Sequence, residues 1–293
     1  MTSDNLRRIF RCCIHRIDHR RIHIITYTFI SNGTHMKFGL IIIGDEILSG
    51  KRADKHMVKV IEILKARGLK LSWAEYLGDD PAWIRDTFKR TFELTAGDDW
   101  CIFSCGGIGA TPDDHTRKAV GDALGVELRL HPEAEAQIRI RSEEMKQEVT
   151  PQRLLMGTFP AGSIIIPNPY NRIAGFAIRR HWFVPGFPVM AWPMVEWVLD
   201  THYKEHFNHE PYLEKSIYVY DLGEGRLIDI MRKIEENPAI KSFSLPSVGD
   251  AKTLAHVELG AKGEPHGVDV AMEAYKAEVE KLGGTWTTAL KSA

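Results

Sequence analysis

The residues best suited to chemistry lie in one glycine-rich segment, Ser104–Asp114, which has the sequence SCGGIGATPDD. Glycine lets the backbone approach a ligand closely, and the N-terminus of a following helix offers free N–H groups to an anion. The segment therefore fits a phosphate or diphosphate, with Ser104, Gly106, Gly107, Gly109 and Thr111 as the candidate binding residues. It is neither a Walker A loop nor the dinucleotide GxGxxG fingerprint, whose spacing fails after Gly109. A glycine-rich turn can also be a tight connection alone.

Carboxylates accompany this segment. Thr111, Pro112 and Asp114 have the spacing of a capped helix start, which would give Asp114 a structural role. Two carboxylates beside a phosphate would, however, repel it unless a divalent cation lies between them. Asp45-Glu46 and Asp79-Asp80 follow the two preceding predicted strands. We expect Asp80 to cap a helix, Asp45, Glu46 and Asp114 to hold metal (Mg²⁺, Mn²⁺ or Co²⁺), and Asp79 and Asp114 to be catalytic.

The elements around these residues predict an α/β fold. Phe38–Ile43 is an apolar run typical of a buried parallel strand, and Asp54–Arg67 has apolar residues at helical spacing. Strands and helices then alternate in the ranges 70–77, 80–95, 100–104, 113–124 and 132–148, and further strands are expected at 163–166 and 175–184, with a helix to about Asp200. This order predicts a three-layer α/β/α, doubly wound, mostly parallel sheet whose βα turns open at one edge. A polar stretch at 202–211 marks a boundary before a small α+β domain.

The composition argues against a membrane-spanning protein and against a disulfide-bonded one. The 293 residues are 44% hydrophobic, with a formal net charge of −1 and no apolar run long enough to cross a bilayer. The four cysteines form no CxxC pair, so we expect a cytoplasmic protein without disulfides. Cys105 could be a nucleophile, but no histidine partner is indicated by spacing, and a packing role is favoured.

The charge is unevenly distributed. Residues 1–35 hold six arginines and two aspartates, which leaves 32 basic and 37 acidic residues, a net of −5, from Met36 onward. A transit peptide and a basic nucleic-acid-binding arm are the alternatives for this segment, but a transit peptide would need more serine. We favour an extension outside the fold, so the expected domains are 1–35, 36–205 and 206–293.

The sequence resembles the molybdopterin-binding, MoCF-biosynthesis-like domain family, closest to the amino-terminal module of the competence/damage-inducible protein A branch. The resemblance is carried by four groups of motifs: GDEILSG at 44–50, GDD at 78–80, GGIGATPDD at 106–114 with Thr116-Arg117, and PNP at 167–169 with VPGFP at 184–188. It spans about 36–199, and a KH-like module is expected to follow. Ala110 stands where the family usually has proline, and Asp45 and Lys55-His56 also depart from it.

The resemblance implies a nucleotide or pterin ligand. One branch hydrolyses ADP-ribose at its diphosphate with a divalent metal, other relatives handle molybdopterin, and a related module cleaves FAD. No amidohydrolase domain follows, so nicotinamide mononucleotide deamidation is not expected. We expect a metal-dependent ADP-ribose pyrophosphatase; the alternative is a non-catalytic molybdopterin-binding protein or molybdenum-cofactor biosynthesis factor. A homo-oligomer is expected, and no membrane partner. RNA binding is disfavoured because the segment at 223–226, GEGR, lacks a basic GxxG loop.

Overall fold

The computed structural model describes residues 36–96, 99–207 and 213–292. The Arg-rich segment 1–35, on which one of the domain predictions falls, lies outside these residues. Within the described residues, no helix is both long and apolar enough to span a bilayer.

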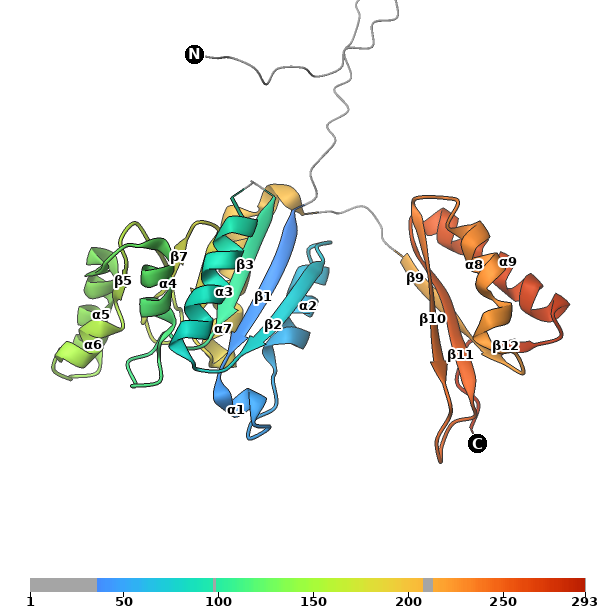
Figure 1. The fold of residues 1–293 in the computed structure, drawn as a ribbon, viewed down its shortest axis with the longest axis horizontal. Coiled ribbons are helices and arrows are strands. Elements are labelled where there is room, and N and C mark those ends of the chain that lie inside the picture. The colour runs from blue at the N-terminus through green and yellow to red at the C-terminus, as the bar shows by residue number, and fades with distance from the viewer. Residues whose placement is uncertain (1–35, 97–98, 208–212, 293) are drawn as a thin grey trace, which may run out of the picture. The chain divides into compact units, whose positions relative to one another are not determined.

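A six-stranded sheet dominates residues 36–207 (Figure 1). Its order is β2-β1-β3-β8-β7-β6, in which the first four strands are parallel and β7 runs antiparallel to both neighbours. The strands are β1 (Lys37–Ile43), β2 (Leu71–Leu77), β3 (Trp100–Cys105), β6 (Ile164–Ile166), β7 (Gly175–Ile178) and β8 (His181–Val184). A separate two-stranded sheet pairs β4 (Leu128–Leu130) with β5 (Thr158–Pro160). The prediction of a mostly parallel α/β/α fold is confirmed.

Helices cover both faces of the six-stranded sheet because the central strands are buried on both sides. Along β1, Leu40 and Ile42 pack into the core beneath α2 and α7, whereas Ile41 and Ile43 pack into the core beneath α3 and α4. The helices of this part are α1 (Asp45–Leu48), α2 (His56–Lys65), α3 (Pro81–Leu94), α4 (Thr116–Leu124), α5 (Pro132–Glu144), α6 (Pro151–Leu155), α7 (Pro188–His202) and the 3₁₀ helix η1 (Lys204–His206). Asp80 caps α3 as expected, because its Oδ1 accepts from Trp83 N–H at 2.7 Å.

Three predicted elements differ from the structure. The expected strand at 175–184 is a hairpin, because Arg179 and Arg180 both adopt positive φ (47° and 62°) and turn the chain between β7 and β8. The helix expected at 132–148 ends at Glu144, and α6 follows it. The helix expected to start at Asp113 starts at Thr116.

Residues 213–292 form an antiparallel sheet of order β10-β11-β9-β12 with its own core. Alternate β11 residues, Val257, Leu259 and Ala261, pack on apolar residues of the long helix α9. The elements are β9 (Leu213–Tyr220), η2 (Glu224–Arg226), α8 (Ile228–Ile234), β10 (Ile240–Ser247), β11 (His256–Gly263), α9 (Pro265–Lys281) and β12 (Thr285–Thr287). The expected small α+β unit is therefore present; the exact domain boundaries and its KH-like character stay predictions.

Candidate ligand-binding site

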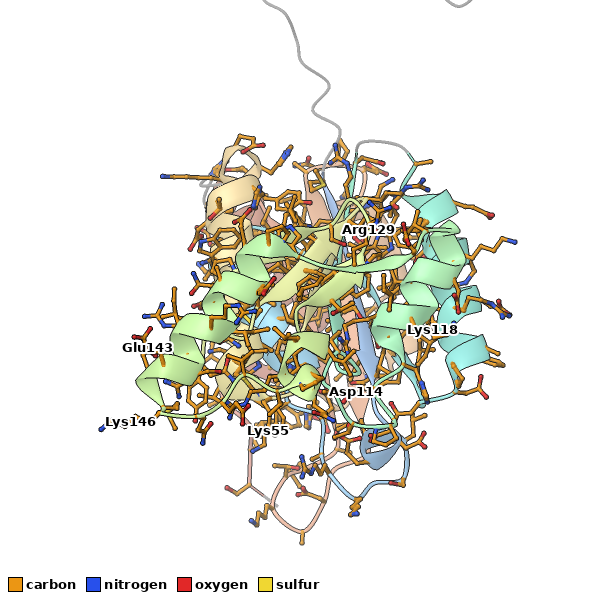
Figure 2. The ribbon with its side chains drawn as sticks, turned by 90° about the vertical axis from the view of Figure 1, so that its left-hand side faces the viewer. Lys55, Asp114, Lys118, Arg129, Glu143 and Lys146 are labelled. Carbon is orange, nitrogen blue, oxygen red and sulfur yellow. The ribbon has the colours of Figure 1, made fainter. Side chains whose placement is uncertain are left out.

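A cavity of about 430 Å³ opens at the carboxyl ends of the parallel strands. Its volume is within the range of small-molecule sites, and this edge is where open α/β sheets bind ligands. Figure 2 places Asp114 at the lower end of this part of the chain, where α1 lies in Figure 1. The lining includes Gly44, Glu46, Arg52, Asp79, Gly106, Gly107, Ile108, Gly109, Ala110, Thr111, Asp113, Asp114, Met156, Asn171, Ile173, Ala174, Pro185, Gly186, Phe187 and Met190.

The glycine-rich segment at 106–111, here called the glycine loop, forms one wall. Gly106 has φ of 110°, and a Cβ there would lie 2.2 Å from the carbonyl oxygen of Ile43. Gly107 has φ of 67°, and its Cβ would lie 2.3 Å from Thr116 Oγ1. The N–H of Gly106 donates to the carbonyl of Val184 at 3.0 Å. Only glycine can let the loop pass this close to β1 and α4.

Asp114 shapes the glycine loop rather than a helix start. Its Oδ1 accepts from Gly109 N–H at 2.8 Å, and its Oδ2 accepts from Thr111 N–H at 2.8 Å and from the Thr111 hydroxyl at 2.5 Å. The prediction that Thr111 caps a helix is therefore wrong. The N-cap position of α4 is His115, which makes no capping bond, and the carboxylate serves the loop that precedes the helix. A charged acceptor shared by three donors holds a turn more strongly than one hydroxyl cap.

Asp45 and Asp79 are joined by reciprocal hydrogen bonds. Asp79 Oδ2 accepts from Asp45 N–H at 2.9 Å, and Asp45 Oδ1 accepts from Asp79 N–H at 3.1 Å. Gly78 permits this approach, since a Cβ there would lie 2.5 Å from Asp45 Oδ1. The two acidic residues thus have a structural duty that the sequence did not indicate, which is to tie the turns after β1 and β2 together.

The pKa of Asp79 is raised above its usual value. Desolvation is the largest cause, and the nearby charges of Asp45, Glu46 and Asp113 act in the same direction, whereas the hydrogen bond from the Asp45 backbone opposes them. Three further carboxylates, those of Glu46, Asp113 and Asp114, line the same cavity.

Two predicted residues lie away from the cavity. Ser104 is fully buried in β3, with no hydrogen-bond partner for its hydroxyl, and it is absent from the cavity lining. Cys105 is also buried, and burial raises the pKa of its thiol, which favours the packing role over a nucleophilic one. Asp45 contacts Asp79 beside the cavity. The cavity is lined by all the other predicted residues, which are Glu46, Asp79, Gly106, Gly107, Gly109, Thr111 and Asp114.

The predicted metal site is not preassembled. Among the described residues, no three His, Cys, Asp or Glu side chains come together as a cluster that could hold an ion. Binding of Mg²⁺, Mn²⁺ or Co²⁺ through Asp45, Glu46 and Asp114 stays a prediction, and in this geometry the ligand or water would have to supply further oxygens.

Sequence reasoning missed two side chains that position the walls. His56 is buried at the start of α2, and its Nε2 lies 3.0 Å from the carbonyl oxygen of Gly186, which lines the cavity. Arg117, on α4, is 8% exposed, and its guanidinium donates to the carbonyls of Gly109 and Thr158. Arg117 belongs to one of the family motifs and His56 to a position that departs from the family, but nothing in their spacing indicated that they face inward.

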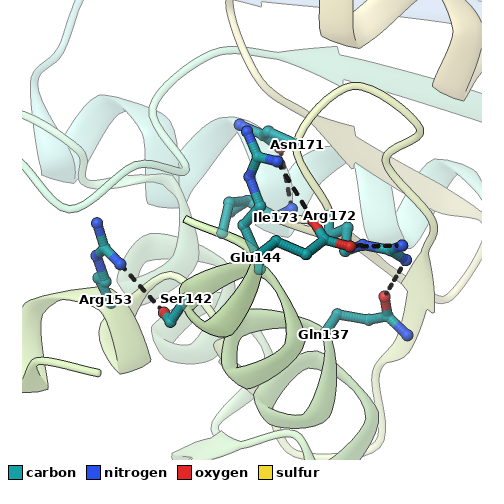
Figure 3. A network of polar contacts seen from close by, with 8 residues as sticks. Gln137, Ser142, Glu144, Arg153, Asn171, Arg172 and Ile173 are labelled. Carbon is teal, nitrogen blue, oxygen red and sulfur yellow. Dashed lines mark hydrogen bonds and ion pairs between the residues drawn. The ribbon is translucent and has the colours of Figure 1, made fainter. Parts of the chain in front are cut away.

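A second part of the cavity lining, here called the apolar wall, consists largely of apolar side chains. Phe187, which is 58% exposed, joins Met156, Ile173 and Met190 there. Ile173 belongs to a loop that is held in place by polar contacts shown in Figure 3. In that loop Arg172 has φ of 64° and pairs with Glu144 of α5 at 2.9 Å.

The family is shown by sequence comparison. Residues 39–205 match the family described as "Probable molybdopterin binding domain". The chain belongs to this family. A competence-damage inducible protein from Limosilactobacillus fermentum is 31% identical over 231 residues, covering 75% of this chain and 55% of the relative. A CinA-like protein from Geobacter metallireducens is 29% identical over 260 residues, covering 85% of this chain and 60% of the relative. The chain thus spans a little over half the length of these relatives.

Two solved structures are similar to part of the chain. The protein CinA from Thermoplasma acidophilum has 25% sequence identity and a TM-score of 0.49, covering 56% of this chain and 97% of that one. The molybdopterin biosynthesis enzyme MoaB from Thermus thermophilus has 20% identity and a TM-score of 0.38, covering 58% and 94%.

The prediction of an ADP-ribose pyrophosphatase is wrong. The family match is to a molybdopterin-binding domain, and the relatives bear competence-damage inducible or CinA-like names. The physical reason for the error lies in the acidic residues Asp45, Asp79 and Asp114, which were expected to bind metal and activate water. Their carboxylates instead accept backbone hydrogen bonds that shape the turns.

Proposed function

We propose that this chain binds molybdopterin, or a closely related phosphorylated pterin, and acts as a molybdenum-cofactor biosynthesis factor. The observation that carries the proposal is the two-sided cavity. The glycine loop lines the cavity with backbone that can hydrogen-bond a phosphate, and the apolar wall with Phe187 suits a flat heterocycle. A phosphorylated pterin has both parts. Membership of the molybdopterin-binding family supports this ligand over other phosphorylated ring compounds.

The test is a binding panel on the purified chain. Fluorescence titration with molybdopterin should give saturable binding, whereas adenosine, ADP-ribose and FAD should bind at least tenfold more weakly. The same titrations with added Mg²⁺, Mn²⁺ or Co²⁺ and with EDTA would test the predicted metal. Light scattering on the same sample would test the predicted homo-oligomer.

Two variants make the panel specific. Phe187→Ala removes the exposed ring from the apolar wall, and we expect it to lower pterin affinity by about tenfold, since stacking on an aromatic ring contributes roughly 1–3 kcal/mol per base. Trp83→Ala, which removes another exposed ring that does not line the cavity, is the matched control. Equal affinity of wild-type protein for molybdopterin and adenosine would refute the proposal.

A further inference from the structure

The charges around the cavity oppose the proposed ligand. Glu46, Asp79, Asp113 and Asp114 line it, and Arg52 is the one cationic side chain among the described residues of the lining. A phosphate entering this cavity would meet an excess of negative charge, which would weaken binding unless positive charge is placed close to it.

Part of this negative charge is already engaged by the protein. Asp114 accepts three hydrogen bonds from the glycine loop, and Asp79 accepts one from the backbone of Asp45. Hydrogen bonds from N–H groups spread and offset the carboxylate charge. The remaining repulsion must be met by cations.

Arg117 places a positive charge directly behind the glycine loop. Of the arginines and lysines in the described residues, it alone is buried. One Nη donates to the carbonyl oxygen of Gly109, while its Nε is buried with no partner. Burying a guanidinium with an unpaired N–H lowers the stability of the fold. Arg117 must therefore gain favourable interactions at the glycine loop that offset this cost.

Arg117 and Asp114 fix the two sides of one residue. Asp114 accepts a hydrogen bond from the N–H of Gly109, and Arg117 donates one to the carbonyl oxygen of the same residue. The carbonyl is therefore held against Arg117, which prevents a carbonyl oxygen from turning toward a bound anion. Arg117 thus acts as a positioning residue and as a charge behind the loop.

Arg52 is the cation on the cavity side. It follows α1, its backbone N–H donates to the carbonyl of Glu46 at 2.9 Å, and its exposed side chain lines the cavity. Lys51 precedes it and is also exposed, but it does not line the cavity. The two neighbouring cations therefore differ in access to the ligand.

We infer that Arg52 and Arg117 together make the cavity an anion site, with Arg52 contacting the phosphate group of the ligand and Arg117 supporting the glycine loop from behind. The inference rests on the proposed function for the identity of the whole ligand, but the anion contact can be measured without it.

The experiment uses two probes in EDTA, so that no metal contributes. Inorganic pyrophosphate reports the anion contact, and 6-hydroxymethylpterin, which carries no phosphate, reports the apolar wall. Calorimetric titration should show Arg52→Met lowering pyrophosphate affinity by about tenfold or more, since a charged hydrogen bond contributes roughly 1.5–3 kcal/mol. Lys51→Met, the matched control, should change it by less than about threefold, because a charge outside the cavity acts only through screened solvent.

Arg117 is tested by charge rescue. Arg117→Met should lower pyrophosphate affinity by about tenfold or more, Arg117→Lys should recover part of the loss, and pterin affinity should stay within about twofold in both variants. A loss of pterin binding equal to the loss of pyrophosphate binding would indicate collapse of the site and overturn the inference. Equal effects of Arg52→Met and Lys51→Met, or no pyrophosphate binding by the wild-type chain, would also overturn it. Pyrophosphate binding without pterin binding would instead refute the proposed function alone.

Discussion

Asp45 and Asp79 each accept a hydrogen bond from the other's backbone N–H, at distances of 2.9 and 3.1 Å. Two acidic residues 34 positions apart in the chain thus join the ends of two neighbouring strands. Carboxylates that repel each other remain adjacent because each faces the other's backbone donor rather than its side chain.

This pairing predicts different effects for two substitutions of Asp79. Asp79→Asn keeps an oxygen that can accept from the Asp45 N–H. It also removes a carboxylate whose charge is disfavoured, because burial and neighbouring carboxylates raise the pKa of Asp79. It should leave the free energy of unfolding unchanged or slightly higher at pH 7. Asp79→Ala removes the acceptor and should cost about 1 kcal/mol. Urea unfolding measures both, and an equal loss in the two variants would contradict the pairing.

Gly107 and Gly125 form a matched pair for testing the glycine loop. Both have φ of 67°, but a Cβ at Gly107 would lie 2.3 Å from Thr116 Oγ1, whereas a Cβ at Gly125 would meet nothing within 4 Å. Gly125→Ala should cost about 1 kcal/mol for the left-handed backbone. Gly107→Ala should cost more and should also lower pyrophosphate affinity by at least tenfold. Urea unfolding measures the stability of both variants, and calorimetry measures their pyrophosphate affinity. Equal results for Gly107→Ala and Gly125→Ala would show that the glycine loop tolerates a side chain and would contradict the prediction.

The carboxylate of Asp114 holds the glycine loop through its hydrogen bonds with Gly109 and Thr111. Asp114→Asn retains one acceptor oxygen for a group that now receives three hydrogen bonds, so the amides of Gly109 and Thr111 should exchange with solvent faster. Loss of charge-assisted bonds in the glycine loop should also weaken pyrophosphate binding by about tenfold. Asp122→Asn, at an exposed residue of α4 that does not line the cavity, is the control. Unchanged exchange in Asp114→Asn would contradict the role assigned to Asp114.

His181 predicts a pH dependence of stability. Burial lowers its pKa to about 4 from 6.5, although the hydrogen bond with the Arg179 carbonyl opposes this shift. The unfolded chain therefore binds the proton more tightly than the folded one. The stability contributed by neutral His181 is fully present above pH 6.5 and is lost as pH falls toward 4.

Urea unfolding at pH 7 and pH 5 measures this dependence. Wild-type protein should lose about 2 kcal/mol more than His181→Gln between the two values, since one pKa unit corresponds to about 1.4 kcal/mol. Comparing the difference between proteins removes the contributions of the other histidines. Parallel pH profiles would show that the pKa of His181 is the same in the folded and the unfolded chain, which would contradict the shift.

The sequence predicted the layers of the fold because its apolar periodicities are strong. Phe38–Ile43 and the helical pattern after Asp54 required little tertiary information. The hairpin at Arg179-Arg180 was missed because two arginines with positive φ are rare turn residues, and the pairing of β7 with β8 that accommodates them is not visible in the sequence.

The site was predicted in composition but not in roles. Glycines and acids at the strand ends indicated where a ligand would bind. The direction of each side chain was not encoded locally, however: Asp114 could cap a helix or hold a loop, and only the observed start of α4 at Thr116 decides between them. Ser104 was wrongly assigned to the ligand for a similar reason. Residues 101–105 of β3 are all buried, so the sequence does not show which of them face the cavity.

The hydrogen bond from Gly106 N–H to the Val184 carbonyl joins the glycine loop to the strand that leads into the Pro185–Phe187 wall. The glycine loop and the segment after Val184 are therefore connected to each other before any ligand arrives. The entropy of ordering them is lost during folding rather than during association. Ligand affinity at this site should consequently be decided by dissociation, as in a preorganised receptor, with little change in backbone order between the free and the occupied protein.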